Sequence, residues 1–123
     1  MQSCSNAIGG SFGLFGQGSP ADTSNGGYQG FVMYLGTSNN LRIRAATDRT
    51  LTLSGWQTLV EAPHQIDNAL HTFRVEFDNS RISFFFDGTL VLETTSTLFR
   101  GSVIGIEDAF CQITVNSFKV YGI

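Results

Sequence analysis

Residues 70–95 read LHTFRVEFDNSRISFFFDGTLVLETT, and this stretch decides the fold. Apolar residues recur at every second position through residues 73–77 and again through residues 82–86. This period places one set of side chains on one face of a strand. Between the runs, Asp78-Asn79-Ser80 and Asp87-Gly88 are typical hairpin turns. We therefore predict a three-stranded antiparallel meander, with strands at Leu70–Phe77, Arg81–Phe86 and Thr89–Thr95.

Shorter strand patterns flank this meander on both sides. In residues 1–27, which are rich in glycine, we expect an edge strand around Phe12–Phe15 and a long loop over Gln17–Gly27, because glycine weakens strands. Residues Ala62–Asn68 contain Pro63 and are expected to form an irregular connection. The other predicted strands are Tyr28–Leu35, Leu41–Ala46, Arg49–Ser54, Trp56–Val60, Gly101–Ile106 and Phe110–Tyr121.

The last of these strands changes phase along its length. Ile113 and Val115 share one parity, whereas Phe118 and Val120 have the other. A two-residue period shifts by one only where an extra residue is inserted, so we predict a β-bulge at Asn116-Ser117. About ten short strands, with little or no helix, predict an all-β protein. We expect one domain over residues 1–123, an antiparallel two-sheet β-sandwich.

Composition excludes several classes of protein. Hydrophobic residues make up 41% of the 123 residues, enough for a real core, so the chain is not disordered. The net charge of -3 offers no basic excess for nucleic acid or anionic membranes, and no apolar run is long enough to span a bilayer. We therefore expect neither nucleic acid nor a membrane as a partner.

Location is suggested only by amino-acid usage and by the first residues. A high content of Ser, Thr and Asn with a single Lys is common in extracellular β-proteins. Met1–Cys4 show neither the charged nor the apolar region of a signal peptide. The expectation is an extracellular protein, or one on a cell or virion surface, without a signal peptide in the given chain.

The two cysteines, Cys4 and Cys111, lie near opposite ends of the chain. Neither belongs to a CxxC motif or a Cys/His cluster, which argues against a structural zinc site. If the first and last strands are neighbours, the two thiols form a disulfide that closes almost the whole chain. The alternative is two unpaired thiols.

Several features of the second half match a known family pattern. A strand opens near His71, another ends in Asp87-Gly88, a glycine-containing strand follows at 101–106, and a terminal strand carries polar Asn116 before its last apolar pair. In these features residues 70–121 resemble the concanavalin A-like lectin/glucanase superfamily, which includes laminin-G-like domains. The resemblance implies a jelly roll whose relatives often bind carbohydrate and sometimes calcium.

The resemblance also bears on catalysis and on metal binding. Members that hydrolyse β-glucans use Glu-x-Asp-x-x-Glu, whose two carboxylates flank the scissile bond. Here the string from Glu76 ends in Arg81, where the second carboxylate is needed, so we predict no enzyme. No cofactor is expected. The alternative is a bound calcium ion, as in some members of the superfamily. Calcium is a hard cation that takes several oxygen ligands. Its candidate ligands are Asn116 and Asp108, with Asp22, Asn25 and Glu107 as further oxygen donors.

Sugar binding needs a flat aromatic ring and fixed polar groups around it. The candidates are the single tryptophan Trp56, together with Tyr34 and Phe85, whose positions lie off or near the core phase. The alternatives are that Trp56 fills the core and that Phe85 lies in a second layer or an interface. Arg42 and Arg44 are two apart on one face and form a fork for acidic sugars or carboxylates, unless they pair with acids on adjacent strands.

These observations support two main functions. The first is a non-catalytic, lectin-like carbohydrate-binding domain. The alternative is a structural or assembly module, a subunit of an extracellular filament, phage appendage or adhesin, that associates with copies of itself through strand edges. The expected partners are accordingly carbohydrate or a second copy in a homo-oligomer.

Overall fold

A computed structural model of the chain describes residues 3–4, 11–20, 28–36, 39–46, 56–65, 69–101, 103–109 and 111–121. These residues form strands and no helix, which confirms the predicted all-β fold. The strands are β1 (Ser3–Cys4), β2 (Ser11–Pro20), β3 (Tyr28–Gly36), β4 (Asn40–Ala46), β5 (Trp56–Pro63), β6 (Phe73–Asp78), β7 (Arg81–Phe86), β8 (Thr89–Thr95), β9 (Val103–Ala109) and β10 (Cys111–Gln112).

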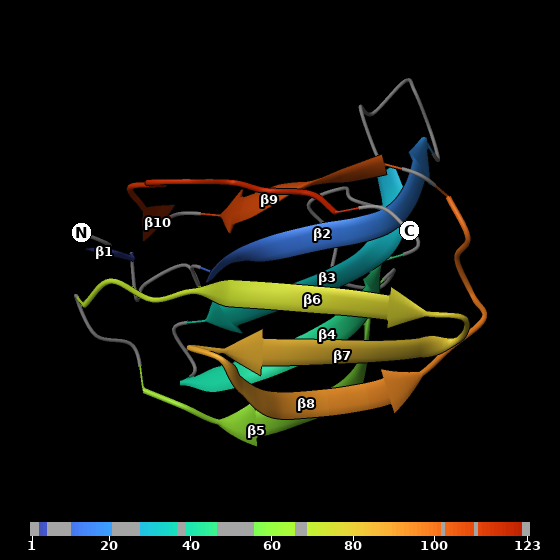
Figure 1. Cartoon of the computed structure of the whole chain (residues 1–123), viewed down its shortest axis with the longest axis horizontal. Coiled ribbons are helices and arrows are strands. Elements are labelled where there is room, and N and C mark those ends of the chain that lie inside the picture. Colours follow the sequence, from blue (N-terminus) through green and yellow to red (C-terminus); the bar gives the residue numbers. More distant parts are fainter. Residues whose placement is uncertain are drawn as a thin grey trace.

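The strands form two main layers and a small additional sheet. Five strands pair antiparallel in the order β5-β4-β3-β2-β9, and three pair in the order β6-β7-β8. The three-stranded sheet lies across one face of the five-stranded sheet (Figure 1). β1 and β10 form a separate two-stranded pairing. This arrangement confirms the predicted antiparallel β-sandwich.

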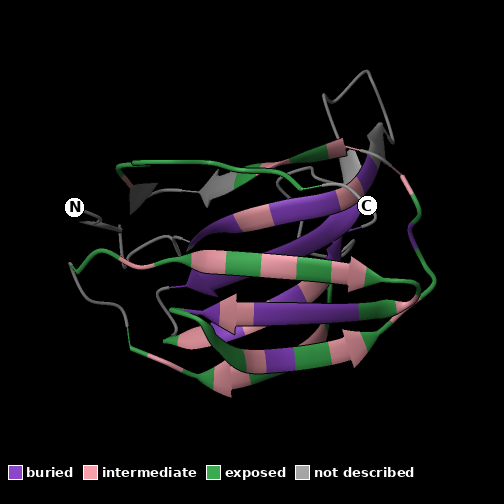
Figure 2. Cartoon of the chain, in the orientation of Figure 1, coloured by how far each residue is buried: buried purple, intermediate pink, exposed green. Residues whose placement is uncertain are grey.

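The predicted meander is present with its predicted turns, but its first strand begins at Phe73 and not at the predicted Leu70. Asp87 and Gly88 both have positive φ, 51° and 83°, as a type I′ hairpin turn requires. Along β6 half-buried and exposed side chains alternate, because only one face of the strand meets the other sheet (Figure 2). β7, in the middle of its sheet, is buried more continuously.

The core lies between the two sheets. Its apolar side chains exclude water from both inner faces, and this burial is the main source of stability. The buried members are Phe12, Phe31, Met33, Leu35, Leu41, Ile43 and Ala45 from the larger sheet, Ile82, Phe84, Phe86 and Leu92 from the smaller sheet, and Phe99.

The N-terminal prediction was wrong in two respects. β2 lies inside the five-stranded sheet, between β3 and β9, and it continues past Gln17 to Pro20. Pairing along both edges of the strand overrides the weak strand preference of its glycines. At Gly13 the absence of a side chain is needed, because a Cβ atom would collide with the backbone oxygen of Met33 and lie 2.6 Å from Cα of Tyr34.

The C-terminal prediction was also wrong. β9 is displaced from the predicted 101–106, and among the described residues beyond it only Cys111–Gln112 form a strand. Residues 113–121 pair with no described strand, so there is no bulge; instead the chain bends at Asn116. Val115, which shares the parity of the partly buried Ile113, is exposed. The phase change therefore marks a bend in an irregular segment.

The remaining strand predictions differ mainly in their ends. β3 and β4 match the predicted strands to within about one residue, and β5 extends the predicted Trp56–Val60 through Pro63, into the expected irregular connection. The predicted strand Arg49–Ser54 and residues 21–27 of the predicted loop lie outside the described residues. The described part of the chain contains no helix that could cross a membrane.

Candidate functional site

A row of polar side chains crosses the outer face of the five-stranded sheet, the face turned away from the three-stranded sheet. Tyr34 on β3 lies directly opposite Arg42 on β4, and Arg42 lies directly opposite Glu61 on β5. Residues directly opposite each other share a face of the sheet, and Arg44, two positions along β4, shares it too. We call Tyr34, Arg42, Arg44 and Glu61 the outer-face row.

Arg42 and Glu61 form the accessible end of this row. Arg42 Nε donates a hydrogen bond to Glu61 Oε2 at 2.7 Å. The Arg42 side chain is 24% exposed and that of Glu61 48% exposed, so the pair is reachable from solvent. Burial by itself lowers the pKa of Arg42, but hydrogen bonds to Tyr34 and Glu61 outweigh it and raise that pKa. The guanidinium therefore stays charged beside its acceptors.

Arg44 and Tyr34 form the deeper end. Arg44 Nη1 donates to the Tyr34 hydroxyl at 3.2 Å, and Arg44 Nε is buried. Tyr34 itself is buried and packs with Phe15, Val32 and Ala46 in a second apolar cluster. Its ring is therefore part of the floor of the site and is not an open stacking surface. Its hydroxyl is hydrogen-bonded to both arginines.

This arrangement offers hydrogen-bond donors and acceptors side by side. A guanidinium presents a planar fork of donors, and an adjacent carboxylate presents acceptor oxygens. Such a pair can donate to one hydroxyl of a vicinal diol and accept from the next. The sequence indicated Tyr34, Arg42 and Arg44, and the structure brings them together. Arg42 pairs with an acid on the adjacent strand, which is the alternative that the sequence left open for the two arginines. The sequence did not indicate Glu61, because β5 carries a bulge opposite Ile43 and Arg44 that changes the alternation before Glu61.

Phe85 lies elsewhere. It is on β7, on the outer face of the three-stranded sheet, opposite Arg74. The Arg74 guanidinium carbon lies 4.2 Å from the centre of the Phe85 ring, and Arg74 also pairs with Glu76 at 3.0 Å. The cation therefore occupies a face of the ring that a sugar would need. A single site would require Phe85 to lie beside the outer-face row. The structure places it on the other sheet.

Trp56 is the first residue of β5. Its backbone pairs with Ala46, the residue two positions beyond Arg44 on β4. Trp56 therefore lies on the edge strand that also carries Glu61 of the outer-face row. Its side chain lies outside the described residues.

The calcium candidates occupy different segments. Asp108 lies in β9 opposite Phe12, and Asn116 lies at the bend of the irregular C-terminal segment. Asp22 and Asn25 lie outside the described residues, as do the side chains of Glu107 and Asp108. Within the described ranges, no group of three or more His, Cys, Asp or Glu side chains could hold a metal ion. Calcium binding stays a prediction.

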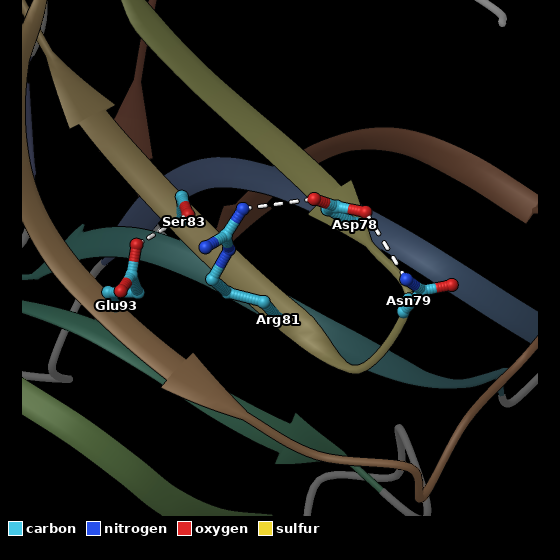
Figure 3. Close-up of polar contacts among 5 residues, drawn as sticks. All are labelled: Asp78, Asn79, Arg81, Ser83 and Glu93. Carbon is cyan, nitrogen blue, oxygen red and sulfur yellow. Dashed lines mark hydrogen bonds and ion pairs between the residues drawn. The ribbon is translucent and has the colours of Figure 1, made fainter.

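The string that resembles a glucanase motif forms a hairpin. Arg81 Nη2 donates to Asp78 Oδ2 at 2.9 Å across the turn between β6 and β7 (Figure 3). Further along the same face, Ser83 Oγ donates to Glu93 Oε2 at 3.0 Å. Asp78 is thus paired with the cation that replaces the second carboxylate of the motif.

His71, near which a strand was predicted to open, is fixed by Asp87. His71 Nδ1 and Asp87 Oδ2 are 2.6 Å apart, and the backbone N–H of Thr72 donates to Asp87 Oδ1 at 2.8 Å. The rings of His71 and His64 both lie within 5 Å of the Phe86 ring centre, at 4.6 and 4.3 Å. His71 thus has a structural hydrogen bond immediately before β6.

Comparisons with known proteins agree with this fold. A solved structure, the carbohydrate binding module CBM66 from Bacillus subtilis, superimposes with a TM-score of 0.62 at 16% sequence identity. The alignment covers 82% of this chain, and the chain spans 57% of that module's chain. No protein-family model and no curated protein matches the sequence. The likeness shows a lectin-like β-sandwich fold; the concanavalin A-like superfamily stays a prediction.

Proposed function

We propose that this protein is a non-catalytic carbohydrate-binding domain and that its sugar ligand contacts the Arg42–Glu61 pair. The observation that carries the proposal is this charged pair, 2.7 Å apart and open to solvent on the outer face of the five-stranded sheet. A module that shares the fold is a carbohydrate-binding protein, which supports the same function.

The chemistry of the pair suits a polyhydroxylated ligand. Adjacent sugar hydroxyls both donate and accept hydrogen bonds, and Arg42 and Glu61 offer one group of each kind at fixed separation. The Tyr34 hydroxyl holds the arginines from below, so little side-chain entropy remains to be lost when a ligand binds. Arg42 and Arg44 outnumber Glu61, so the row also tolerates a sugar that carries a carboxylate.

Absence of catalysis is part of the proposal. Retaining and inverting glycosidases need two carboxyl groups that face one scissile bond. The outer-face row contains one carboxylate, Glu61, and that group is hydrogen-bonded to Arg42. On the other sheet Asp78 is paired with Arg81. An extracellular or surface location accords with the composition and is proposed on that ground alone.

The test is glycan binding by a matched pair of variants. Glycan-array screening identifies a ligand, and calorimetry then compares Glu61→Gln with Glu93→Gln, which removes the same charge from the opposite face. Hydrogen bonds to charged groups are worth about 1.5–3 kcal/mol, so we expect Glu61→Gln to weaken binding by roughly 10- to 100-fold. Glu93→Gln should bind like the unmodified protein. Absence of any glycan ligand, or equal losses in the two variants, would refute the proposal.

A further inference from the structure

The outer face of the larger sheet changes in exposure from one strand to the next. Around Arg42, three rungs of directly opposed residues cross β3, β4 and β5 on this face. The rungs consist of Gly36, Asn40 and Pro63, of Tyr34, Arg42 and Glu61, and of Val32, Arg44 and Thr58. In each of these rungs the residue of β3 is buried, that of β4 is half-buried and that of β5 is exposed. In Figure 2 the described residues of β3 are accordingly drawn as buried, whereas those of β5 are intermediate and exposed.

These exposures define an open strip that runs along two strands. We call the outward positions within residues 40–44 of β4 and 58–63 of β5 the edge shelf. The buried residues of β3 close the shelf along one side, and on the other side β5 is the last of the described strands of the sheet. At about 3.4 Å per residue, Asn40 and Arg44 lie about 14 Å apart along β4. The shelf is therefore longer than a single sugar unit.

The edge shelf offers hydrogen-bonding groups along its whole length. Arg42 and Glu61, a donor and an acceptor, form its middle. The Asn40 amide lies at one end and the exposed Thr58 hydroxyl at the other, and both groups can donate and accept. A regular glycan chain repeats the same pattern of hydroxyls from unit to unit. Consecutive units can therefore meet suitable partners along the shelf.

The buried side of the shelf restricts the direction in which a long ligand can lie. A ligand laid across the strands would meet a single rung, because beyond β4 the outward residues of β3 are buried. A ligand laid along β4 and β5 would meet all three rungs. Each additional hydrogen bond strengthens binding, whereas the loss of translational and rotational freedom occurs only once. Binding along the strands therefore uses the most contacts.

We propose that the edge shelf binds an internal stretch of a linear polysaccharide, with the sugar chain parallel to β4 and β5 and the Arg42–Glu61 pair at its middle. This inference rests on the proposed function and names the class of sugar ligand for the same site. Beyond one end of the shelf Asn39 and Gln65 are exposed, and beyond the other Gln57 is exposed. The sugar chain can therefore continue past both ends.

Calorimetry with oligosaccharides of increasing length tests the proposal. The probes are linear cello-, xylo-, manno- and fructo-oligosaccharides, from the single sugar to the hexamer, together with the same series for any other glycan that the array identifies. Each unit that reaches a further rung adds about one hydrogen bond, which should lower the dissociation constant by roughly 2- to 10-fold. The affinity should then level off once the oligosaccharide is longer than the shelf.

Variants at the two ends of the shelf separate a long site from a short one. Asn40→Ala and Thr58→Ala should each weaken hexamer binding by roughly 2- to 10-fold and leave the shortest sugar that binds at the central pair unaffected. Thr95→Ala is the matched control for Thr58→Ala, because Thr95 is an exposed residue opposite Arg81 on the other sheet. It should change neither affinity. Thermal unfolding of each variant verifies that it is folded.

Amide chemical shifts of the labelled protein report the direction of the bound chain. Changes on addition of the hexamer should follow residues 40–44 and 57–63, and changes that run across β2 to β9 would overturn the inference. Equal affinity for the shortest sugar and the hexamer, or recognition confined to a branched glycan, would overturn it and leave the proposed function standing. Absence of any glycan ligand would exclude both.

Discussion

Cys4 lies directly opposite Cys111 in the antiparallel pairing of β1 with β10. Directly opposed residues in such a pair have Cα atoms about 4.5–5.5 Å apart, which is within the range that a disulfide needs. The two residues are separated by almost the whole chain, and the register nevertheless brings them to the same position. This placement supports the disulfide predicted from the sequence.

We therefore predict that the oxidised protein contains a Cys4–Cys111 disulfide. In the chain-entropy model a loop of this length stabilises the fold by roughly 4–5 kcal/mol. Reduction, or Cys4→Ser, should lower Tm by about 10–20 °C. Mass spectrometry of the unreduced protein should show the loss of two hydrogens, and two thiols that react freely under native conditions would contradict the prediction.

Gly13→Ala should destabilise the fold because the new methyl group would meet backbone. Its neighbours would be the carbonyl oxygen of Met33 and Cα of Tyr34, and strands β2 and β3 would have to separate. Overpacking of this kind costs about 1–3 kcal/mol. Gly105→Ala on β9 is the matched control, since a Cβ there meets nothing within 4 Å. Urea unfolding compares them, and equal midpoints would show that the close approach at Gly13 is not real.

Asp87→Ala should loosen the end of the β6–β7–β8 sheet. The substitution removes the acceptor of the Thr72 N–H and the partner of His71, and it puts alanine at a φ of 51°. Leaving a hydrogen bond unmade costs about 1–3 kcal/mol. Asp87→Asn keeps an acceptor oxygen and tolerates positive φ, so we expect it to lose clearly less stability in thermal unfolding. If both variants lose the same stability, the hydrogen bonds are not responsible.

Trp56→Ala should abolish glycan binding and leave the thermal transition nearly unchanged. The register places Trp56 on the edge strand β5, next to β4, which carries Arg44. Loss of an aromatic surface against a sugar ring removes a contact that polar groups do not replace. Phe85→Ala is the comparison: its ring is held beneath Arg74 on the opposite sheet, so binding should persist. Calorimetry with a glycan identified by array distinguishes the two, and the reverse result would move the site to the three-stranded sheet.

The sequence was most informative where alternation was strict. The meander from β6 to β8 could be predicted apart from its start, which is Phe73 and not Leu70, because each strand has an apolar face and each turn has residues suited to it. Arg42 and Arg44 could be placed on one face for the same reason. Glu61 could not, since the bulge in β5 that brings it opposite Arg42 has no counterpart in the residue pattern. Phe85 was grouped with the site because parity identifies a face of a strand but not the sheet to which that face belongs.

The glycine-rich N-terminus shows where local preference fails. Its glycines weaken an isolated strand, yet β2 lies in the interior of the larger sheet because neighbours on both sides supply hydrogen bonds and because Gly13 permits close approach. At the other end, alternation in residues 113–120 predicted a strand that the fold does not form. A strand needs a partner as well as a pattern, and a pattern of side chains contains no information about which edge is available.

The sequence by itself therefore determined three features: the all-β class, the three-stranded meander, and the face shared by Arg42 and Arg44. Tertiary structure alone decided which residues from distant strands meet: Glu61 with Arg42, Cys4 opposite Cys111, and Arg74 over Phe85. The physical reason is that side-chain period is a local property of the backbone. Strand order and register depend instead on contacts between segments far apart in the chain, and those contacts are specified only when both sheets pack together.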